Sequence, residues 1–281
     1  MTQPPIVTVG IPCFHAQETI ARAVTSLLKG QGVPVTVVIT ADDSVDYRDV
    51  LDKAGIRDDR IEFRRSPQPR SGVSVARNLA LAHAGTPFCA VLDADDVYEP
   101  GRLSALVPLA EAHGAALCNT REVLLSGKER LVIDPRPDGV TMMRLADIFA
   151  SGTGQLPLFR TEHLGAGWRE GLTFCEDFTF LAELMGRTGG PLPCHPGSYY
   201  TYIHREGSAS NEADEEVTLT RAISSYQQIL DWLAAGTLDL TQALEAEFRT
   251  EIEGRLQINQ AYADARAAGD RRSFREFAGI D

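Results

Sequence analysis

The chain has 281 residues, of which 43% are hydrophobic and 23% charged, the balance of a globular protein rather than a disordered one. Asp and Glu number 39 against 27 Lys and Arg, which gives a formal charge of −12 at pH 7. A general nucleic-acid binder needs an excess of cations, so this composition argues against nucleic acid as a partner. The acidic groups suit metal cations better.

Five scattered cysteines form no CxxC pair, which argues against a zinc site or a disulfide framework and favours a reducing compartment. The N-terminal MTQPPIVTVGIPCF has no basic segment before its apolar run. No window approaches the roughly 20 consecutive apolar residues of a membrane span. These features predict a cytoplasmic protein that is at most peripheral at the inner face of the membrane.

Strands and helices alternate through the first hundred residues. Short apolar or β-branched runs predict strands, and apolar residues at helical spacing predict helices. The expected strands are 6–11, 34–40, 60–65 and 87–92, and the expected helices are 17–29, 72–83 and one opened by Pro100. This alternation predicts an α/β fold with a mostly parallel sheet that helices cover on both faces.

The second half has a mixed pattern that becomes helical. A strand or hairpin is expected at 116–133, and helices are expected at 143–150 and 177–186. After a polar interval at 206–216, helical spacing predicts the long helices 219–233 and 241–268. A helical extension over 211–281 therefore follows the α/β part.

Three carboxylates follow the most apolar strand. Asp93, Asp95 and Asp96 lie at its carboxyl end, the edge where ligands bind in open α/β sheets. Neighbouring negative charges repel one another, so a cation would stabilise them, and Mg²⁺ or Mn²⁺ has the matching preference for oxygen. The alternative is that one Asp caps the helix that Pro100 opens while the others are solvated.

Three segments in order, VTVGIPCFHAQETIARAVTSLL, VVITADDSVD and SGVSVARNLALAHAGTPFCAVLDADD, resemble the nucleotide-sugar half of family 2 glycosyltransferases. Asp93-Ala94-Asp95 stands where that family has its DXD motif. The resemblance covers roughly residues 6 to 210 and implies the GT-A fold, a Rossmann-like α/β domain. It implies a domain over 1–210, with a nucleotide-sugar half at 1–114 and an acceptor half at 115–210.

The resemblance assigns residues to the base of a nucleotide donor. Pro12 and Phe14 match positions that flank the base, where Phe14 would stack on a uracil-like ring; the alternative for Phe14 is core packing. Asp42 matches the acid that bonds the base edge. The family usually has Asp-Asp-Gly-Ser, whereas this chain has Ala41-Asp42-Asp43-Ser44, so Asp43 is the alternative if the register differs by one.

Further residues are assigned to the phosphates and the metal. Arg77 and Asn78 match the family's Ala-Arg-Asn near a helix N-terminus, a favourable place for phosphate. Arg77 would pair with the pyrophosphate or with an Asp of the DXD motif, the alternative being a surface position. Asp95 would hold Mg²⁺ or Mn²⁺, and Asp93 would lie near the ribose or the metal.

Phe174-Cys175-Glu176-Asp177-Phe178 resembles the family's ED motif. An inverting transferase needs a general base near the acceptor hydroxyl. Asp177 matches that base, and Glu176 would support or orient it. The alternative is that both acids only favour a helix N-terminus through its dipole.

A tyrosine-rich segment ending in His204 and Arg205 resembles the close of the family's catalytic domain, where His is followed by Ser-x-Ser. His204 would complete the metal shell or touch the diphosphate, and Arg205 would neutralise the leaving group. A lone His is more often structural than a ligand. The tyrosine-rich approach could equally be a packed strand.

These observations predict a metal-dependent inverting glycosyltransferase. It would move a sugar from a nucleotide-diphosphate sugar, with a UDP-sugar favoured, to the hydroxyl of a saccharide or lipid-linked acceptor in cell-surface polysaccharide or glycolipid synthesis. A sugar nucleotidyltransferase is one alternative, but it would carry a Gly-rich basic loop that IPCFHAQ lacks. A degenerate GT-A domain acting as a nucleotide-binding or scaffolding module is the other, and it would not need the whole set of acids.

The last residues are locally basic in an acidic chain. Phe274 and Phe277 are three apart and would share a helix face, with Arg271, Arg272 and Arg275 nearby. Such a patch could contact an anionic membrane that carries a lipid acceptor. The alternative is that both phenylalanines dock into this protein or into a second subunit of an oligomer.

Overall fold

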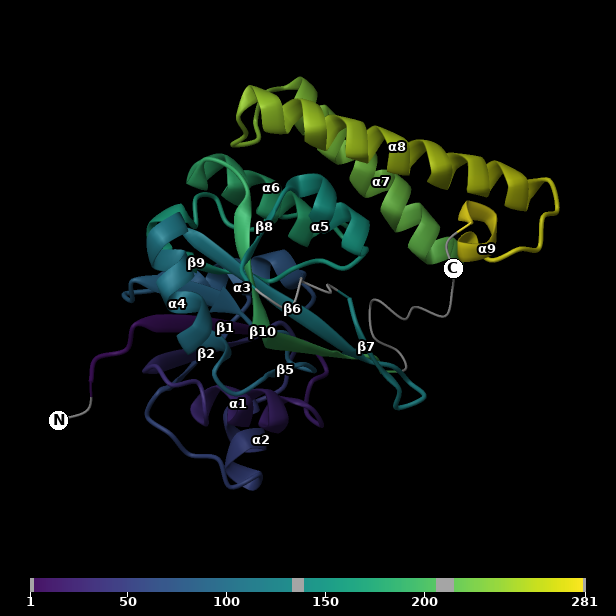
Figure 1. The fold of residues 1–281 in the computed structure, drawn as a ribbon. Coiled ribbons are helices and arrows are strands. Elements are labelled where there is room, and N and C mark those ends of the chain that lie inside the picture. Colours follow the sequence, from purple (N-terminus) through teal and green to yellow (C-terminus); the bar gives the residue numbers. More distant parts are fainter. Residues whose placement is uncertain (1–2, 133–138, 206–214, 280–281) are drawn as a thin grey trace.

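The computed structural model describes residues 3–132, 139–205 and 215–279 (Figure 1). Its strands are β1 (Val7–Cys13), β2 (Val35–Ala41), β3 (Ile61–Arg65), β4 (Phe88–Val91), β5 (Val97–Tyr98), β6 (Ala115–Val123), β7 (Glu129–Leu131), β8 (Thr141–Met143), β9 (Leu158–Arg160) and β10 (Leu192–Ile203). Its α-helices are α1 (Ile20–Leu28), α2 (Tyr47–Lys53), α3 (Val73–Leu81), α4 (Arg102–His113), α5 (Leu145–Ser151), α6 (Glu176–Thr188), α7 (Glu215–Ala234), α8 (Gln242–Ala267) and α9 (Phe274–Ala278).

Within the described residues, one ten-stranded sheet runs in the order β3-β2-β1-β4-β9-β6-β10-β5, with β7 on β6 and β8 on β10. Strands β3, β2, β1 and β4 pair in parallel, and so do β6 and β10. The short β9 is antiparallel to both β4 and β6, so these two keep one direction. The expected mostly parallel α/β sheet is confirmed.

The sheet forms where apolar runs are long enough to be buried on both faces. Every residue of β1 and β4 is buried, as expected for central parallel strands. Gly10 in β1 lets α3 approach closely, because a Cβ there would lie 2.7 Å from the Cβ of Ala80. This close packing fixes α3, which carries Arg77 and Asn78, against the centre of the sheet.

The predicted elements agree with the structure except for short ones. The expected hairpin at 116–133 is β6 and β7, and the tyrosine-rich segment is the packed strand β10, which pairs with β6. The sequence analysis did not predict α2 or the two- and three-residue strands β5, β8 and β9, whereas the helix face expected for Phe274 and Phe277 lies in α9. These strands are too short to show a pattern of their own, and their pairing defines them.

The long helices α7 and α8 pack against each other, and Figure 1 shows them as a pair on the side of the molecule where α5 and α6 lie. Helix α8 contacts α5 and α6, and Phe248 of α8 lies 5.9 Å from the ring of Phe149 in α5. The proposed boundary at 210/211, the Ser-x-Ser at 208–210 and most of the polar interval fall outside the described residues. Within the described residues, no helix is both long and apolar enough to cross a membrane.

The C-terminal phenylalanines dock onto this chain. The rings of Phe274 and Phe277 lie 5.4 and 5.2 Å from the ring of Tyr262 in α8. The backbone N–H of Phe274 donates to Glu215 Oε1 at the start of α7. Both phenylalanines therefore dock into this protein, as the alternative to a membrane contact proposed.

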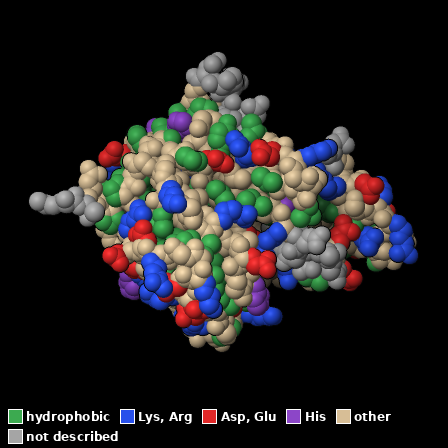
Figure 2. Space-filling view, turned by 90° about the horizontal axis from the view of Figure 1, so that it is seen from below, with side chains coloured by type: hydrophobic (Ala, Val, Ile, Leu, Met, Phe, Trp, Pro, Cys, Tyr) green, Lys and Arg blue, Asp and Glu red, His purple; other side chains and the backbone are tan. Residues whose placement is uncertain are grey.

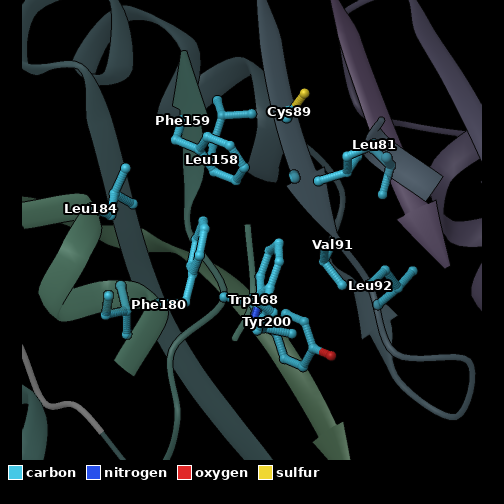
Figure 3. Packing of buried hydrophobic residues seen from close by; sticks show 14 of the residues in the cluster. Leu81, Cys89, Val91, Leu92, Leu158, Phe159, Trp168, Phe180, Leu184 and Tyr200 are labelled. Atoms are coloured by element: carbon cyan, nitrogen blue, oxygen red, sulfur yellow. The ribbon is translucent and has the colours of Figure 1, made fainter. Parts of the chain in front are cut away.

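Charges of both signs share the face shown in Figure 2, where basic and acidic side chains alternate among hydrophobic and other groups. Among the residues drawn in colour, neither sign forms a continuous surface over this face. The buried residues include a cluster around Trp168, Phe180 and Phe159, which come from a loop, α6 and β9 and which Figure 3 shows close together.

Candidate active site

The predicted donor residues follow strands that end at one edge of the sheet. Phe14 follows β1, Asp42 follows β2, and Asp93 follows β4 by two residues. Because β1 pairs in parallel with both β2 and β4, the carboxyl ends of these strands lie side by side. This edge is where open α/β sheets bind ligands.

Arg77 joins the two halves of the predicted site. Its side chain is 2% exposed, and its Nη2 donates to both oxygens of Asp93 at 2.9 and 3.1 Å. Its Nη1 donates to Asp177 Oδ1 at 2.6 Å and lies 3.6 Å from Glu176 Oε1. Arg77 thus pairs with Asp93 of the Asp93-Ala94-Asp95 segment, and since it is buried the surface alternative is wrong. One guanidinium neutralises carboxylates from both motifs.

Asp177 lies in the first turn of α6, two residues after Cys175, which has a left-handed backbone with φ of 67°. Burial raises the pKa of Asp177 to about 6; the charge of Arg77 opposes this rise and that of Glu176 adds to it. Burial also raises the pKa of Asp93. A carboxyl group with a raised pKa at a sheet edge is well suited to accept a proton near neutral pH.

Trp168 is a site residue that the sequence analysis missed. Its indole Nε1–H donates to Asp177 Oδ1 at 2.9 Å. Its ring is buried and stacks on Phe180 at 3.8 Å with an interplanar angle of 9°. Trp168 stands in the loop before α6, outside every motif, and composition gave no signal that it would reach Asp177.

Asn78 holds this tryptophan rather than facing the donor edge. Its Oδ1 accepts from the backbone N–H of Trp168, and its Nδ2 donates to the carbonyl of Trp168, both at 2.8 Å. Gly167 is close enough to Asn78 that any Cβ at this position would overlap Oδ1. Both ends of the Asn78 amide are bonded to protein in this structure, and donor binding by Asn78 stays a prediction.

Each of the three clustered carboxylates has a different partner. Asp93 pairs with Arg77, and Asp95 Oδ2 lies 2.6 Å from Arg205 Nε. Asp96 is fully buried, where its oxygens accept from the hydroxyl of Tyr200 at 2.7 Å and the backbone N–H of Ile203 at 2.8 Å. Asp96 therefore fastens β10 to the loop after β4, which is neither the capping role nor the solvated position of the alternative.

A cavity of about 460 Å³ lies beside Arg205, the residue that pairs with Asp95. It is lined by the segment between β1 and α1 and by the second residue after β10, namely His15, Gln17, Glu18, Thr19 and Arg205. The Nη2 of Arg22, in α1, donates to the carbonyl of Asp95 at 2.6 Å and fixes this loop from the other side. Arg205 and the residues that follow β1 therefore line the same cavity.

The predicted metal ligands are not brought together. The Nε2 of His204 lies 3.3 Å from Glu122 Oε2, and its ring meets that of Tyr202 edge to face. In the part of the chain that the structure describes, no group of three or more His, Cys, Asp or Glu is arranged to hold a metal ion. Asp95 alone still fits a Mg²⁺ or Mn²⁺ ion, because such ions take one or two carboxylates and fill their shell with substrate phosphates and water.

The loops after β1 and β2 hold one another. Asp42 is buried, and its two oxygens accept from the backbone N–H groups of Ser71 and Gly72. Asp43, also buried, accepts from the N–H of His15 at 2.7 Å and from the hydroxyl of Tyr47 at 2.9 Å. Both candidate base-binding acids are therefore engaged in fixing the loops at this edge.

Phe14 and Arg70 stand at the mouth of the same edge. Phe14 is 38% exposed, which rules out full core packing, and the Arg70 guanidinium lies 5.5 Å from its ring centre. Pro12 is buried within β1 opposite Thr40, one step before the strand end. The exposed ring is the part of this loop that a flat ligand can contact.

Comparisons with known proteins agree with this architecture. Among solved structures, S. aureus TarS 1-349 in complex with UDP-GlcNAc superposes with a TM-score of 0.65 and 19% identity, over 89% of this chain and 72% of that one. The structure of TarS 1-349 without that ligand gives 0.62 and 18%, over 89% and 71%. At this identity the likeness establishes the GT-A fold alone.

Curated relatives come from bacterial polysaccharide synthesis. The succinoglycan biosynthesis protein ExoO of Rhizobium meliloti is 31% identical over 225 residues, 73% of this chain and 63% of ExoO. The Escherichia coli UDP-Glc:alpha-D-GlcNAc-diphosphoundecaprenol beta-1,3-glucosyltransferase WfgD is 29% identical over 106 residues, 37% of this chain and 40% of WfgD. The chain thus spans less than two thirds of the length of these relatives. The model of the family described as glycosyl transferase family 2 matches residues 8–148, and the chain belongs to that family.

Proposed function

We propose that this chain transfers a sugar from a nucleotide-diphosphate sugar, with a UDP-sugar as the favoured donor, to an acceptor hydroxyl with inversion at the anomeric carbon. The observation that carries the proposal is Arg77, whose buried guanidinium binds Asp93 after β4 and Asp177 in α6 at once. The nucleotide-diphosphate of a donor held at the sheet edge and a base in α6 would then lie on opposite sides of the sugar that is transferred. Family membership supports the same chemistry.

Asp177 is the general base of this proposal. In direct displacement, the acceptor oxygen attacks the anomeric carbon while its proton passes to the Asp177 carboxylate, and the bond to the diphosphate breaks. A pKa of about 6 keeps Asp177 ionised at neutral pH and leaves it basic enough to take the proton. Glu176, 3.6 Å from Arg77, adds negative charge that favours proton uptake by its neighbour.

The donor would lie along the loops that follow β1, β2 and β4. Phe14 would stack on the nucleotide base, a use for an aromatic ring that stays 38% exposed. Arg205, which lines the cavity and pairs with Asp95, would neutralise charge that builds on the departing diphosphate. The TarS complex with UDP-GlcNAc and the name of WfgD, which includes UDP-Glc, support a uridine donor.

Asp95 is the residue that we propose for Mg²⁺ or Mn²⁺, shared with the diphosphate. The ion would act as a Lewis acid that stabilises the leaving diphosphate. Asp93 is held on both oxygens by Arg77, and His204 is paired with Glu122, so neither belongs to this proposed set. The metal-free Asp95 keeps its charge paired with Arg205.

The acceptor class follows from the relatives. ExoO is a succinoglycan biosynthesis protein, and the name of WfgD states a diphosphoundecaprenol-linked acceptor. We propose a saccharide or lipid-linked acceptor in cell-surface polysaccharide or glycolipid synthesis, used at the cytoplasmic side of the membrane. The five cysteines are free and buried, which is compatible with a reducing compartment.

The test is a panel of UDP- and GDP-sugars with Mn²⁺ or Mg²⁺, in which release of the nucleoside diphosphate is measured with and without candidate acceptors. NMR of the product gives the anomeric configuration relative to the donor. Release of UDP with an inverted product supports the proposal, and retention contradicts it. Release of pyrophosphate from UTP and a sugar phosphate would identify a nucleotidyltransferase instead, and thermal stabilisation by UDP without turnover would identify a binding module.

A further inference from the structure

The two oxygens of Asp177 have different surroundings. Oδ1 accepts two hydrogen bonds, from Arg77 Nη1 at 2.6 Å and from Trp168 Nε1 at 2.9 Å. Among the described residues, no hydrogen bond reaches Oδ2. A carboxylate whose one oxygen is saturated by two donors presents the other oxygen, with its lone pairs free, to an incoming hydroxyl.

Gly154 packs closely against Asp177 on the side of Oδ2. A Cβ on Gly154 would lie 3.0 Å from the Cβ of Asp177 and 3.2 Å from its Oδ2. Gly154 has no positive φ, so the backbone here does not require glycine. A side chain at position 154 would therefore crowd Asp177 and its Oδ2, which gives a steric reason for the glycine.

Trp168 is itself held by groups that do not touch Asp177. Asn78 bonds both the N–H and the carbonyl of Trp168 at 2.8 Å, and Phe180 stacks on its ring at 3.8 Å. The indole N–H is therefore fixed in direction by the backbone and by the ring plane. A donor with a fixed direction fixes the rotation of the carboxylate that accepts from it.

We propose that Trp168 is a positioning residue for the base of the proposed transfer: its N–H, with Arg77, holds Oδ1 so that Oδ2 of Asp177, which a side chain at position 154 would crowd, takes the acceptor proton. This inference rests on the proposed function. It adds to that function which oxygen reacts, which residue orients it, and why position 154 is a glycine.

The contact also has a predictable effect on protonation. The groups that face Asp177 are Arg77 from α3, Glu176 beside it on α6, Trp168 from the preceding loop, and Asp93 on the far side of Arg77. The hydrogen bond from Trp168 lowers the pKa of Asp177 against the effect of burial. Removing that bond should move the inflection of the acid limb of kcat upward by about one pH unit.

The kinetic test compares Trp168→Phe with Trp232→Phe, because the chain has two tryptophans. Phenylalanine keeps an aromatic ring against Phe180 and removes the N–H, although it is smaller than the indole. We expect Trp168→Phe to lower kcat about tenfold below the inflection, with a smaller loss at pH 8.5 and an unchanged KM for the UDP-sugar. Trp232→Phe should match the wild type. An identical pH profile and kcat in both variants would overturn the proposal.

Gly154→Ala tests the Oδ2 side of the carboxylate. The methyl group should lower kcat/KM for the acceptor at least tenfold while leaving the affinity for UDP within twofold of the wild type, since the donor is proposed to lie along the loops after β1, β2 and β4. Normal acceptor kinetics in Gly154→Ala would contradict the assignment of Oδ2. Circular dichroism and thermal melts of each variant establish that it is folded.

A measurement without turnover separates this inference from the proposed function. In Trp232→Phe, Trp168 is the remaining tryptophan, and its emission should titrate with a midpoint near pH 6 as Asp177 gains its proton. Adding Asp177→Asn should abolish that titration. A clear titration in a protein that transfers no sugar would leave the contact standing and reject the function, whereas turnover with no titration would reject the contact.

Discussion

Replacing Arg77 by methionine removes the cation that holds the two halves of the site together and keeps an unbranched apolar stem in its place. Asp93, Glu176 and Asp177 would then face one another without a counterion. Breaking a buried ion pair from one side costs about 3–5 kcal/mol. Because the side chains of Asp93 and Asp177 are 29% and 19% exposed, we expect the low end, about 3 kcal/mol at pH 7.5.

That loss should shrink as the pH falls. Arg77 lowers the pKa of both Asp93 and Asp177, so its removal raises the pKa of each carboxyl further in the folded state. A group whose pKa is higher in the folded than in the unfolded state makes the folded state bind more protons. Stability then falls as the pH rises through the folded-state pKa values, so the deficit of Arg77→Met is largest at pH 7.5 and smaller at pH 5.

The assay is urea unfolding of both proteins at pH 5 and pH 7.5, together with thermal melts, in which about 3 kcal/mol corresponds to roughly 6–12 °C. Arg57→Met is the matched control, because Arg57 forms an exposed ion pair with Asp52 at 3.1 Å, a kind worth at most about 1 kcal/mol. Adding Asp177→Asn to Arg77→Met should recover part of the loss. A deficit equal to that of the control, or one that does not change with pH, would refute the reasoning.

Three further predictions concern the donor edge. Asp95→Ala should abolish stabilisation by Mn²⁺ with UDP in thermal melts while the metal-free melting temperature stays within about 2 °C, and retained stabilisation would exclude Asp95 as ligand. Arg205→Gln should bind Mn²⁺ about two- to fivefold more tightly in calorimetry without nucleotide, because the Arg205 guanidinium no longer competes with the ion for Asp95. Weaker binding would argue against this competition. Phe14→Ala should weaken UDP about tenfold through lost stacking, and unchanged affinity would place the base elsewhere.

Much of the fold could be predicted from the sequence because strands buried on both faces of a parallel sheet appear in the sequence as continuous apolar runs. The runs at 6–11 and 87–92 each predicted a strand within two residues of its observed bounds, Val7–Cys13 and Phe88–Val91. Helix α2 was missed although a signal was present: Asp46 caps it by accepting from the N–H groups of Arg48 and Asp49. The strands β5, β8 and β9 could not be found, because two or three residues carry no period.

The site was predictable as a set of motifs and unpredictable as a set of contacts. Asp93, Arg77 and Asp177 were predicted as site residues, and the structure shows the predicted pairing of Arg77 with Asp93. Asn78 was assigned to the donor, but it bonds the backbone of Trp168, 90 residues further along the chain. Such a bond depends on how a loop closes over α3, which local composition does not encode.

The buried aspartates after β2, Asp42 and Asp43, support backbone segments that have strained φ values. Among the described residues, the non-glycine positions with positive φ are His15, Arg70 and Cys175, and all three border the site. Each such conformation costs on the order of 1–3 kcal/mol and persists only where surrounding contacts fix it. The N–H of His15 donates to Asp43 Oδ2 at 2.7 Å, and that of Arg70 donates to the carbonyl of Asp42 at 2.7 Å.

These contacts connect the strain to the exposed aromatic ring. His15 follows Phe14 directly, and Arg70 lies over its ring, so the two strained residues determine where that ring and its cation stand. Asp42 and Asp43 would then contribute to binding a nucleotide base indirectly, because they hold in place the Phe14 ring on which the base would stack. Cys175 is the strained residue at the α6 side of the site, where its left-handed backbone precedes the first turn of the helix. Its carbonyl accepts from Thr179, and this contact holds the first turn so that Asp177 reaches Arg77.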